Sequence, residues 1–117
     1  MKKPLLAITM GDPAGVGAEI VVKAYNELSS GGATIFVIGS ADCLRQAMQQ
    51  TGCQHGIKVI GSPEDIVDSL QTIQVLEPVS FDASSLVVGQ VAASCGEAAV
   101  RYFETAVTLC LDARIQG

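Results

Sequence analysis

Residues 8–20 read Ile-Thr-Met-Gly-Asp-Pro-Ala-Gly-Val-Gly-Ala-Glu-Ile and join an apolar segment, Leu5–Met10, to a segment with helical periodicity. Three glycines and a proline in so short a connection lower stability unless the backbone needs them, because glycine loses conformational entropy and proline lacks a donor. In α/β proteins, ligands bind at the mouth of such strand-to-helix turns. The run therefore predicts a shaped turn at a candidate ligand site.

Three glycine-loop patterns can be compared with this turn. A Walker loop is excluded because no lysine follows Gly17. A dinucleotide fingerprint that starts at Gly15 requires a third glycine at position 20, where this chain has Ile20. The spacing from Gly11 through Gly15 to Gly17 resembles that of short-chain dehydrogenases. That class also needs Tyr-x-x-x-Lys, and Tyr102 has alanine four residues later.

The charges around the turn restrict the chemical groups that a ligand could present to it. A helix start attracts anions, but Asp12 and Glu19 would already occupy that positive field. No lysine or arginine lies between Pro4 and Val22. Hydroxyl groups, an amide or a ribose are therefore expected in preference to a bare phosphate. The alternative is that Glu19 only offsets the helix dipole and the glycines only permit close packing.

The same run resembles the amino-terminal signature of the 4-hydroxythreonine-4-phosphate dehydrogenase family. That signature is a strand, then Gly-Asp/Glu-Pro-Ala-Gly-Ile/Val-Gly, usually a proline, and an acidic residue. Residues 11–17 and Glu19 match it, and Ala18 departs from it where proline is commoner. The resemblance implies NAD-dependent oxidation and decarboxylation of a phosphorylated hydroxy-amino acid, in pyridoxal 5′-phosphate biosynthesis. It also implies a three-layer α/β fold similar to isocitrate and isopropylmalate dehydrogenases, with a largely parallel sheet and flanking helices.

By this resemblance, the glycine turn lines a cleft near the dinucleotide and the substrate. The expected cleft-lining, cofactor-binding residues are Asp12, Pro13, Gly15, Gly17 and Glu19. A divalent metal (Zn, Mg or Co) is implied as well, but its histidine ligands and the family's lysine are expected beyond residue 117, since His55 is the only histidine. Residues 1–117 are thus expected to be the amino-terminal α/β portion of a two-domain homodimeric enzyme, with an incomplete first domain. Alone, they are expected to be inactive.

Other functions stay open at this point. The parent enzyme could act on another four-carbon phosphorylated hydroxy acid, because most substrate contacts are expected outside this chain. A short-chain-dehydrogenase-type domain that binds a dinucleotide is a second possibility. A third is a non-catalytic α/β module that associates with itself through small residues in the last helix.

Composition restricts the class of protein. The chain has 117 residues, of which 49% are hydrophobic and 16% charged, with 7 basic and 12 acidic side chains. The acidic balance argues against nucleic-acid binding, and no apolar run approaches the roughly 20 residues of a membrane helix. The apolar start is also too short for a signal peptide, so a cytoplasmic protein is expected. Because the chain is small and rich in apolar residues, part of its apolar surface is expected to pack against other protein.

Hydrophobic periodicity and turn residues predict alternating strands and helices, which favours a parallel sheet. The expected strands are residues 5–10, 34–38, 58–60 and 74–76, and the expected helices are 18–28, 41–50 and 90–115, with one helical turn at 63–64 and a loop at 79–89. Ser40 is expected to cap the second helix. The first helix is expected to bury Ile20, Val21, Ala24, Tyr25 and Leu28.

The last predicted helix should bury a stripe made of Val91, Cys95, Ala98, Tyr102, Ala106, Leu109 and Cys110. Glu97 and Arg101 could form an ion pair on its polar side. The four scattered cysteines are expected to be reduced packing residues. A metal site at Cys53 and His55 is not expected, because two ligands are too few.

Overall fold

The computed structural model describes residues 4–13, 15–29, 31–52, 54–67, 72–79 and 93–117. Strands and helices alternate along the chain, as the sequence predicts. In order they are β1 (Leu5–Thr9), α1 (Gly17–Ser29), β2 (Thr34–Ile38), α2 (Ala41–Thr51), β3 (Gly56–Ile60), the 3₁₀ helix η1 (Pro63–Asp65), β4 (Thr72–Leu76) and α3 (Ala93–Leu111).

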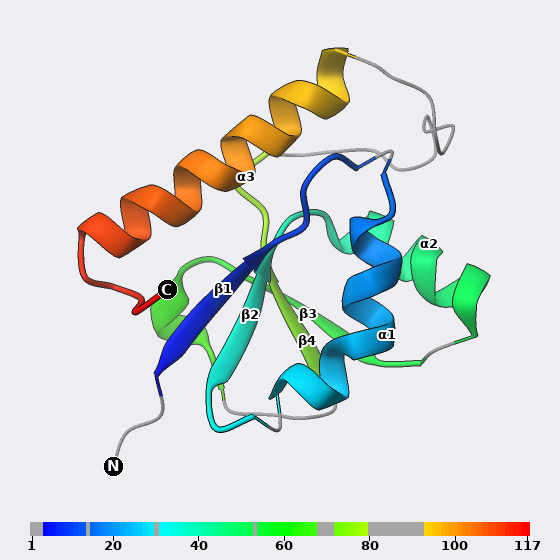
Figure 1. Cartoon of the computed structure of the whole chain (residues 1–117), viewed down its shortest axis with the longest axis horizontal. Helices are drawn as coiled ribbons and strands as arrows, with labels where there is room; N and C mark the ends of the chain where they lie inside the picture. The colour runs from blue at the N-terminus through cyan, green and yellow to red at the C-terminus, as the bar shows by residue number, and fades with distance from the viewer. Residues whose placement is uncertain (1–3, 14, 30, 53, 68–71, 80–92) are drawn as a thin grey trace.

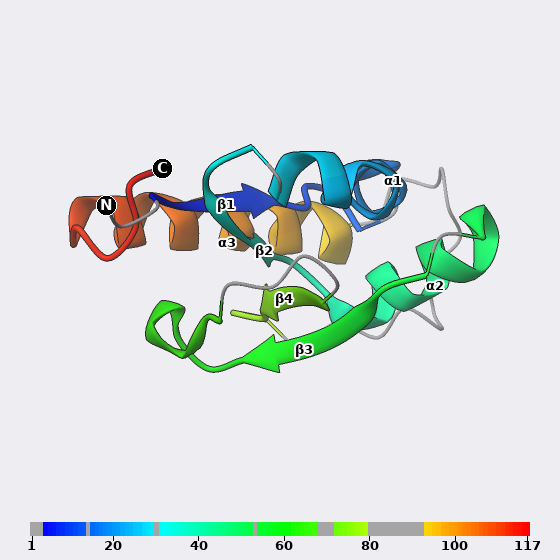
Figure 2. The ribbon, with the colours of Figure 1, turned by 90° about the horizontal axis from the view of Figure 1, so that it is seen from below.

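The four strands form one parallel sheet in the order β1-β2-β4-β3. Figure 2 shows these strands one below another. Right-handed connections that step from β1 to β2 and on to β3 place α1 and α2 on one face. Helix α3 contacts β1 and β2 from the other face, as Figure 1 shows. The expected three-layer α/β architecture with a parallel sheet is confirmed.

The second helix shows how local sequence sets its boundaries. Ser40 is the N-cap, and its Oγ accepts a hydrogen bond from the Cys43 N–H at 3.3 Å. Gly52 ends the helix in the left-handed region (φ 75°), and its N–H donates to the Met48 carbonyl oxygen at 2.9 Å. Both ends use the residue types that such positions favour. The predicted Ser40 cap is confirmed.

The first helix buries a different face from the one predicted. Ala18, Val21, Val22 and Tyr25 enter the core, whereas Ile20 is 59% exposed. The buried set has the spacing of one helical face. Ile20 lies off that face, because contacts with the sheet and with α2 fix the rotation of the helix. The prediction that Ile20 is a core residue was wrong.

The last helix is shorter than predicted. It ends at Leu111, and Ala113 then takes a left-handed conformation (φ 57°) that closes the helix end, while the Arg114 N–H donates to the Leu109 carbonyl oxygen at 3.0 Å. Ile115 is buried beyond that turn. The prediction that the helix extends to residue 115 was wrong, and its expected start at residues 90–92 lies outside the described part.

The buried stripe of α3 agrees with the prediction at most described positions. Cys95, Ala98, Tyr102 and Leu109 are buried. Cys110 is exposed instead, so its assignment to the core was wrong. Val91 and Cys53 lie outside the described residues, as does most of the predicted loop at 79–89. None of the described helices is long and apolar enough to span a membrane.

The residues after α3 run along the outer edge of β1. The Gln116 N–H donates to the Leu5 carbonyl oxygen at 2.9 Å, and the Ala7 N–H donates to the Gly117 carbonyl oxygen at 2.7 Å. The Gln116 side chain also accepts a bond from the Leu5 N–H at 2.7 Å. Both edges of β1 therefore carry hydrogen bonds, to β2 on one side and to residues 116–117 on the other.

Candidate functional site

The glycine turn lies at the carboxyl end of β1. The Met10 N–H donates to the Ile38 carbonyl oxygen at 2.9 Å, so the contact with β2 continues past the strand end. Gly11 then turns the chain with a positive φ of 77°. A Cβ at Gly17 would lie only 2.0 Å from the Met10 carbonyl oxygen. Gly17 is therefore required by the close approach of α1 to the end of β1.

The structure brings the predicted cleft residues together at this edge. Asp12 and Gly15 are exposed, Pro13 is buried, and Gly17 and Glu19 are half-buried. The Gly15 N–H donates to the Asp12 carbonyl oxygen at 2.9 Å, which closes the turn on itself. Glu19 follows in the first turn of α1. One face of the turn is therefore open while the other packs inward.

The ends of β2 and β4 continue the same edge. A Cβ at Gly39 would meet the Met10 side chain at 2.7 Å, so the end of β2 lies directly against the end of β1. The Ala41 N–H donates to a Glu77 side-chain oxygen at 3.2 Å, which joins the start of α2 to the end of β4. The connections that follow β2 and β4 lead to helices on opposite faces. Open α/β sheets bind ligands beyond the carboxyl ends of their strands, where neighbouring connections lead to opposite faces.

The side chains at the carboxyl ends of these strands are mainly acidic. Asp12 and Glu19 border the turn, and Glu77 stands at the start of α2. Ser40 and Glu77 already accept hydrogen bonds from the first free N–H groups of α2, which leaves fewer donors for an anion. Carboxylates and backbone groups suit a ligand that offers hydroxyl or amide hydrogens.

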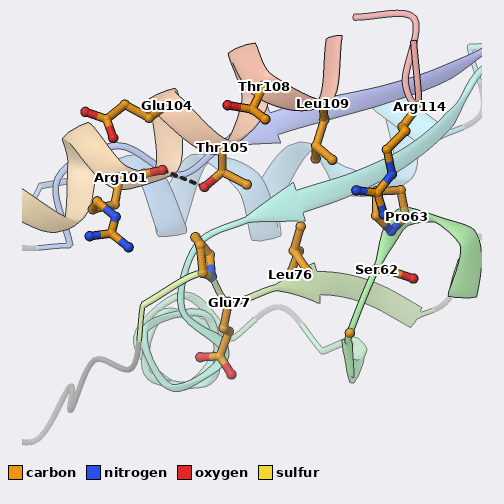
Figure 3. A pocket seen from close by; sticks show the side chains of 12 residues that line it. Ser62, Pro63, Leu76, Glu77, Arg101, Glu104, Thr105, Thr108, Leu109 and Arg114 are labelled. Carbon is orange, nitrogen blue, oxygen red and sulfur yellow. Dashed lines mark hydrogen bonds between the residues drawn. The ribbon is translucent and has the colours of Figure 1, made fainter. Parts of the chain in front are cut away.

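A groove that the sequence did not predict lies on the α3 face of the sheet. Its volume is about 510 Å³. Figure 3 shows Arg101, Glu104 and Thr108 of α3 on one side of it and Glu77 on the other. The predicted ion pair between Glu97 and Arg101 is absent from the described salt bridges.

Arg114 borders the same groove and pairs with Glu64 of η1. Its Nε and Nη2 each donate to one carboxylate oxygen of Glu64 at 2.8 Å, which is the bidentate geometry of strong Arg–carboxylate pairs. These bonds lower the pKa of Glu64 from 4.5 to about 2. Because the two residues are 50 positions apart, nothing in the local sequence signals the pair. Glu77 could have been found, since it directly follows a strand.

Metal binding can be considered only for the described residues. They contain no group of three or more His, Cys, Asp and Glu side chains placed to hold an ion. His55 instead shares a 2.8 Å hydrogen bond between its Nε2 and the Val22 carbonyl oxygen, and it packs edge-on against Tyr25. The residues described here therefore do not fit the divalent metal that the family resemblance implies.

Comparisons with known proteins place these features in context. No family model matches the chain. It is 35% identical to a D-threonate 4-phosphate dehydrogenase from Bordetella bronchiseptica, over 97% of this chain and 33% of that protein. It also superposes on a 4-hydroxythreonine-4-phosphate dehydrogenase from Burkholderia phymatum with a TM-score of 0.91 and 34% identity, covering 98% of this chain and 35% of the other.

A more distant structure shares the same framework. A terephthalate 1,2-cis-dihydrodiol dehydrogenase from Burkholderia xenovorans gives a TM-score of 0.71 at 25% identity, over 97% of this chain and 32% of its own. The chain spans about one third of the length of each of these relatives. The predicted resemblance is confirmed: the chain is homologous to part of the proteins named 4-hydroxythreonine-4-phosphate dehydrogenase and D-threonate 4-phosphate dehydrogenase.

Proposed function

We propose that this chain is the amino-terminal α/β portion of an NAD-dependent, divalent-metal-dependent dehydrogenase that acts on a phosphorylated four-carbon hydroxy acid. The observation that carries this proposal is the glycine turn at the carboxyl end of β1, in a framework that matches a 4-hydroxythreonine-4-phosphate dehydrogenase at a TM-score of 0.91. We also propose that the whole enzyme is a cytoplasmic homodimer.

In this proposal the turn forms one wall of the cofactor cleft. Gly11 and Gly17 shape the backbone, and Asp12 and Glu19 offer carboxylates to hydroxyl groups such as those of a ribose. Pro13 and Gly15 complete the wall. The phosphates of the dinucleotide would lie elsewhere, because the first 22 residues supply basic side chains only at Lys2 and Lys3.

The metal would be bound by residues outside this chain. When bound in a dehydrogenase of this kind, a divalent ion polarises the oxygen that is oxidised. The described residues offer no ligand set for it. We therefore expect the 117-residue chain to bind nucleotide weakly and to catalyse no oxidation by itself.

D-threonate 4-phosphate is a second candidate substrate beside 4-hydroxythreonine 4-phosphate. Curated relatives that are 30–35% identical to this chain carry the D-threonate name, whereas the superposed Burkholderia phymatum enzyme carries the other. The terephthalate dihydrodiol dehydrogenase shares the framework and its named substrate has no phosphate. We infer that substrate choice depends on parts of the enzyme outside these elements.

The cofactor assignment can be tested on the chain itself by titrating NAD⁺ into ¹⁵N-labelled protein and following amide chemical shifts. We expect shifts at residues 10–19 and 39–41, and a weaker response in the Asp12→Asn variant. Asp65→Asn is the matched control, because Asp65 is also an exposed acid in the first turn of a helix but lies in η1, outside these two segments. Shifts confined to the α3 groove, or an unchanged response in Asp12→Asn, would contradict the assignment.

The substrate is tested in an enzyme that contains this chain. NADH formation is followed with each phosphorylated acid, with and without a chelator. Oxidation of either acid that stops on chelation and resumes with added metal supports the proposal. Activity that needs no metal, or no activity with either acid, contradicts it.

A further inference from the structure

Met10, the last residue before the glycine turn, is held by its backbone and by its side chain. Its N–H donates to the Ile38 carbonyl oxygen at 2.9 Å. A Cβ on Gly17 would overlap its carbonyl oxygen, so the start of α1 lies directly against it. Its side chain is only 3% exposed. Met10 therefore joins the end of β1 both to the end of β2 and to the start of α1.

The Met10 side chain lies directly against Gly39, which follows β2. A Cβ on Gly39 would lie 2.7 Å from the Met10 Cβ, 3.0 Å from its Sδ and 3.4 Å from its Cγ. Because the Met10 Cβ is bonded to the backbone, rotation about χ1 would not move it away from such an atom. Gly39 therefore leaves the space that Met10 occupies, and any side chain there would displace the backbone.

The placement of the exposed turn residues follows from Met10. Gly11 comes directly after it and starts the turn with a positive φ of 77°. The Gly15 N–H closes the turn on the Asp12 carbonyl oxygen at 2.9 Å. Asp12 and Gly15 are exposed, so their position depends on the packed residues around them, of which Met10 is the first.

We propose that Met10 is a positioning residue for cofactor binding: its side chain, packed against Gly39, fixes the direction in which the glycine turn leaves β1 and so holds Asp12 in the cleft. This inference rests on the proposed function of the turn. Met10 is buried, so it acts through the turn and not by contact with the nucleotide. Binding residues need such packed support, because affinity depends on their being held in the productive geometry.

Nucleotide affinity tests the role of the side chain. NAD⁺ is titrated into the ¹⁵N-labelled chain, and its dissociation constant is taken from the amide shifts of the turn. Met10→Ala should raise this constant about tenfold, because a turn that keeps its binding geometry about a tenth of the time loses affinity in that proportion. Met10→Leu should restore most of the affinity, because leucine fills a similar volume. Equal weakening by alanine and leucine would contradict this packing role.

Met48→Ala is the matched control. Met48 is also a buried methionine, at 7% exposed, but it lies toward the end of α2, where its Sδ accepts a hydrogen bond from the His55 N–H at 3.3 Å. Both truncations leave a cavity and lower stability, which thermal unfolding measures. Only Met10→Ala should also weaken nucleotide binding. Equal dissociation constants in the two truncation variants would overturn the inference.

Gly39→Ala applies the opposite perturbation, because it adds an atom at the contact where Met10→Ala removes several. It should also raise the dissociation constant. Gly56→Ala is its control, since a Cβ there would meet the Thr72 side chain at 3.1 Å, where β3 and β4 begin. This pair decides the question even if Met10→Ala does not fold. Equal affinities in the two glycine variants would count against Met10 as the positioning residue.

Hydrogen exchange without nucleotide separates this inference from the proposed function. Met10→Ala should speed the exchange of the Gly15 N–H, because the turn opens more often, whereas Met48→Ala should leave it unchanged. A wild type whose turn amides do not respond to NAD⁺ would contradict the proposed function, whatever the exchange rates. A wild type that does respond, with equal Gly15 exchange in the two variants, would overturn this inference alone.

Discussion

Two fully buried tyrosines differ in what their hydroxyl groups contact, and this difference predicts opposite effects of the same substitution. Tyr25 and Tyr102 are both 0% exposed. The Tyr25 hydroxyl donates to the Thr72 carbonyl oxygen at 3.0 Å, with the Ile35 carbonyl oxygen at 3.4 Å. The Tyr102 hydroxyl has no hydrogen-bond partner in the described part of the chain. Replacement by phenylalanine removes only that oxygen.

The expected magnitudes follow from the cost of burying a polar group. A buried hydroxyl without a partner costs about 1–3 kcal/mol, and a satisfied hydrogen bond contributes about 1 kcal/mol net. Tyr102→Phe should therefore raise the free energy of unfolding by about 1 kcal/mol or more, and Tyr25→Phe should lower it by about 1 kcal/mol. Burial also raises the pKa of Tyr102, so its phenol stays neutral and no charge effect enters the comparison.

Urea unfolding followed by far-UV circular dichroism measures both variants. The slope of the free energy of unfolding against urea concentration should be the same for the wild type and both variants. A shift in the unfolding midpoint then reports a change in stability alone. The two variants should differ by about 2 kcal/mol in free energy of unfolding, and their melting temperatures should lie on either side of the wild type. A loss in Tyr102→Phe as large as that in Tyr25→Phe would refute the reasoning, because it would show that the Tyr102 hydroxyl has a partner.

Three further predictions concern the turn, the groove and the cysteines. Gly17→Ala should lower the free energy of unfolding by about 3 kcal/mol, through the clash at the end of β1, whereas Gly96→Ala should raise it by up to about 1 kcal/mol; urea unfolding measures both. The Arg114 guanidinium holds the pKa of Glu64 at about 2, so the stability from this pair is complete above pH 4.5 and is lost as the pH falls toward 2. Carboxyl NMR titration should show the Glu64 pKa return toward 4.5 in Arg114→Gln. Iodoacetamide should alkylate the exposed Cys110 before the buried Cys43 and Cys95, as peptide mass spectrometry can show.

Features that depend on neighbouring residues were predictable from sequence. The turn after β1 follows from its glycines and proline, and the start of α2 follows from Ser40. The short strands β3 and β4 were also found, although each begins two residues earlier than predicted. In each of these cases the signal and the structure lie within a few positions of each other.

Features fixed by distant contacts were not predictable. The rotation of α1, which exposes Ile20 and buries Val22, depends on the sheet and on α2. The end of α3 carries no glycine or proline, and Ala113 takes a left-handed conformation there while Ile115 is buried and Gln116 bonds to β1. Helical periodicity alone would continue through these residues, so the prediction extended the helix too far.

The candidate site also combines local features, which the sequence predicts, with contacts between residues far apart in the chain, which it does not predict. The turn that includes Asp12 and Gly17 is a local feature, so it could be predicted, and the terephthalate dihydrodiol dehydrogenase shares the framework that holds it at a TM-score of 0.71. The contact of Glu77 with α2 and the pairing of Arg114 with Glu64 join residues far apart in sequence. A framework shared by enzymes with such different named substrates cannot select between those substrates. We therefore infer that the turn serves what these enzymes have in common, and that substrate choice is made by parts of the enzyme outside this framework.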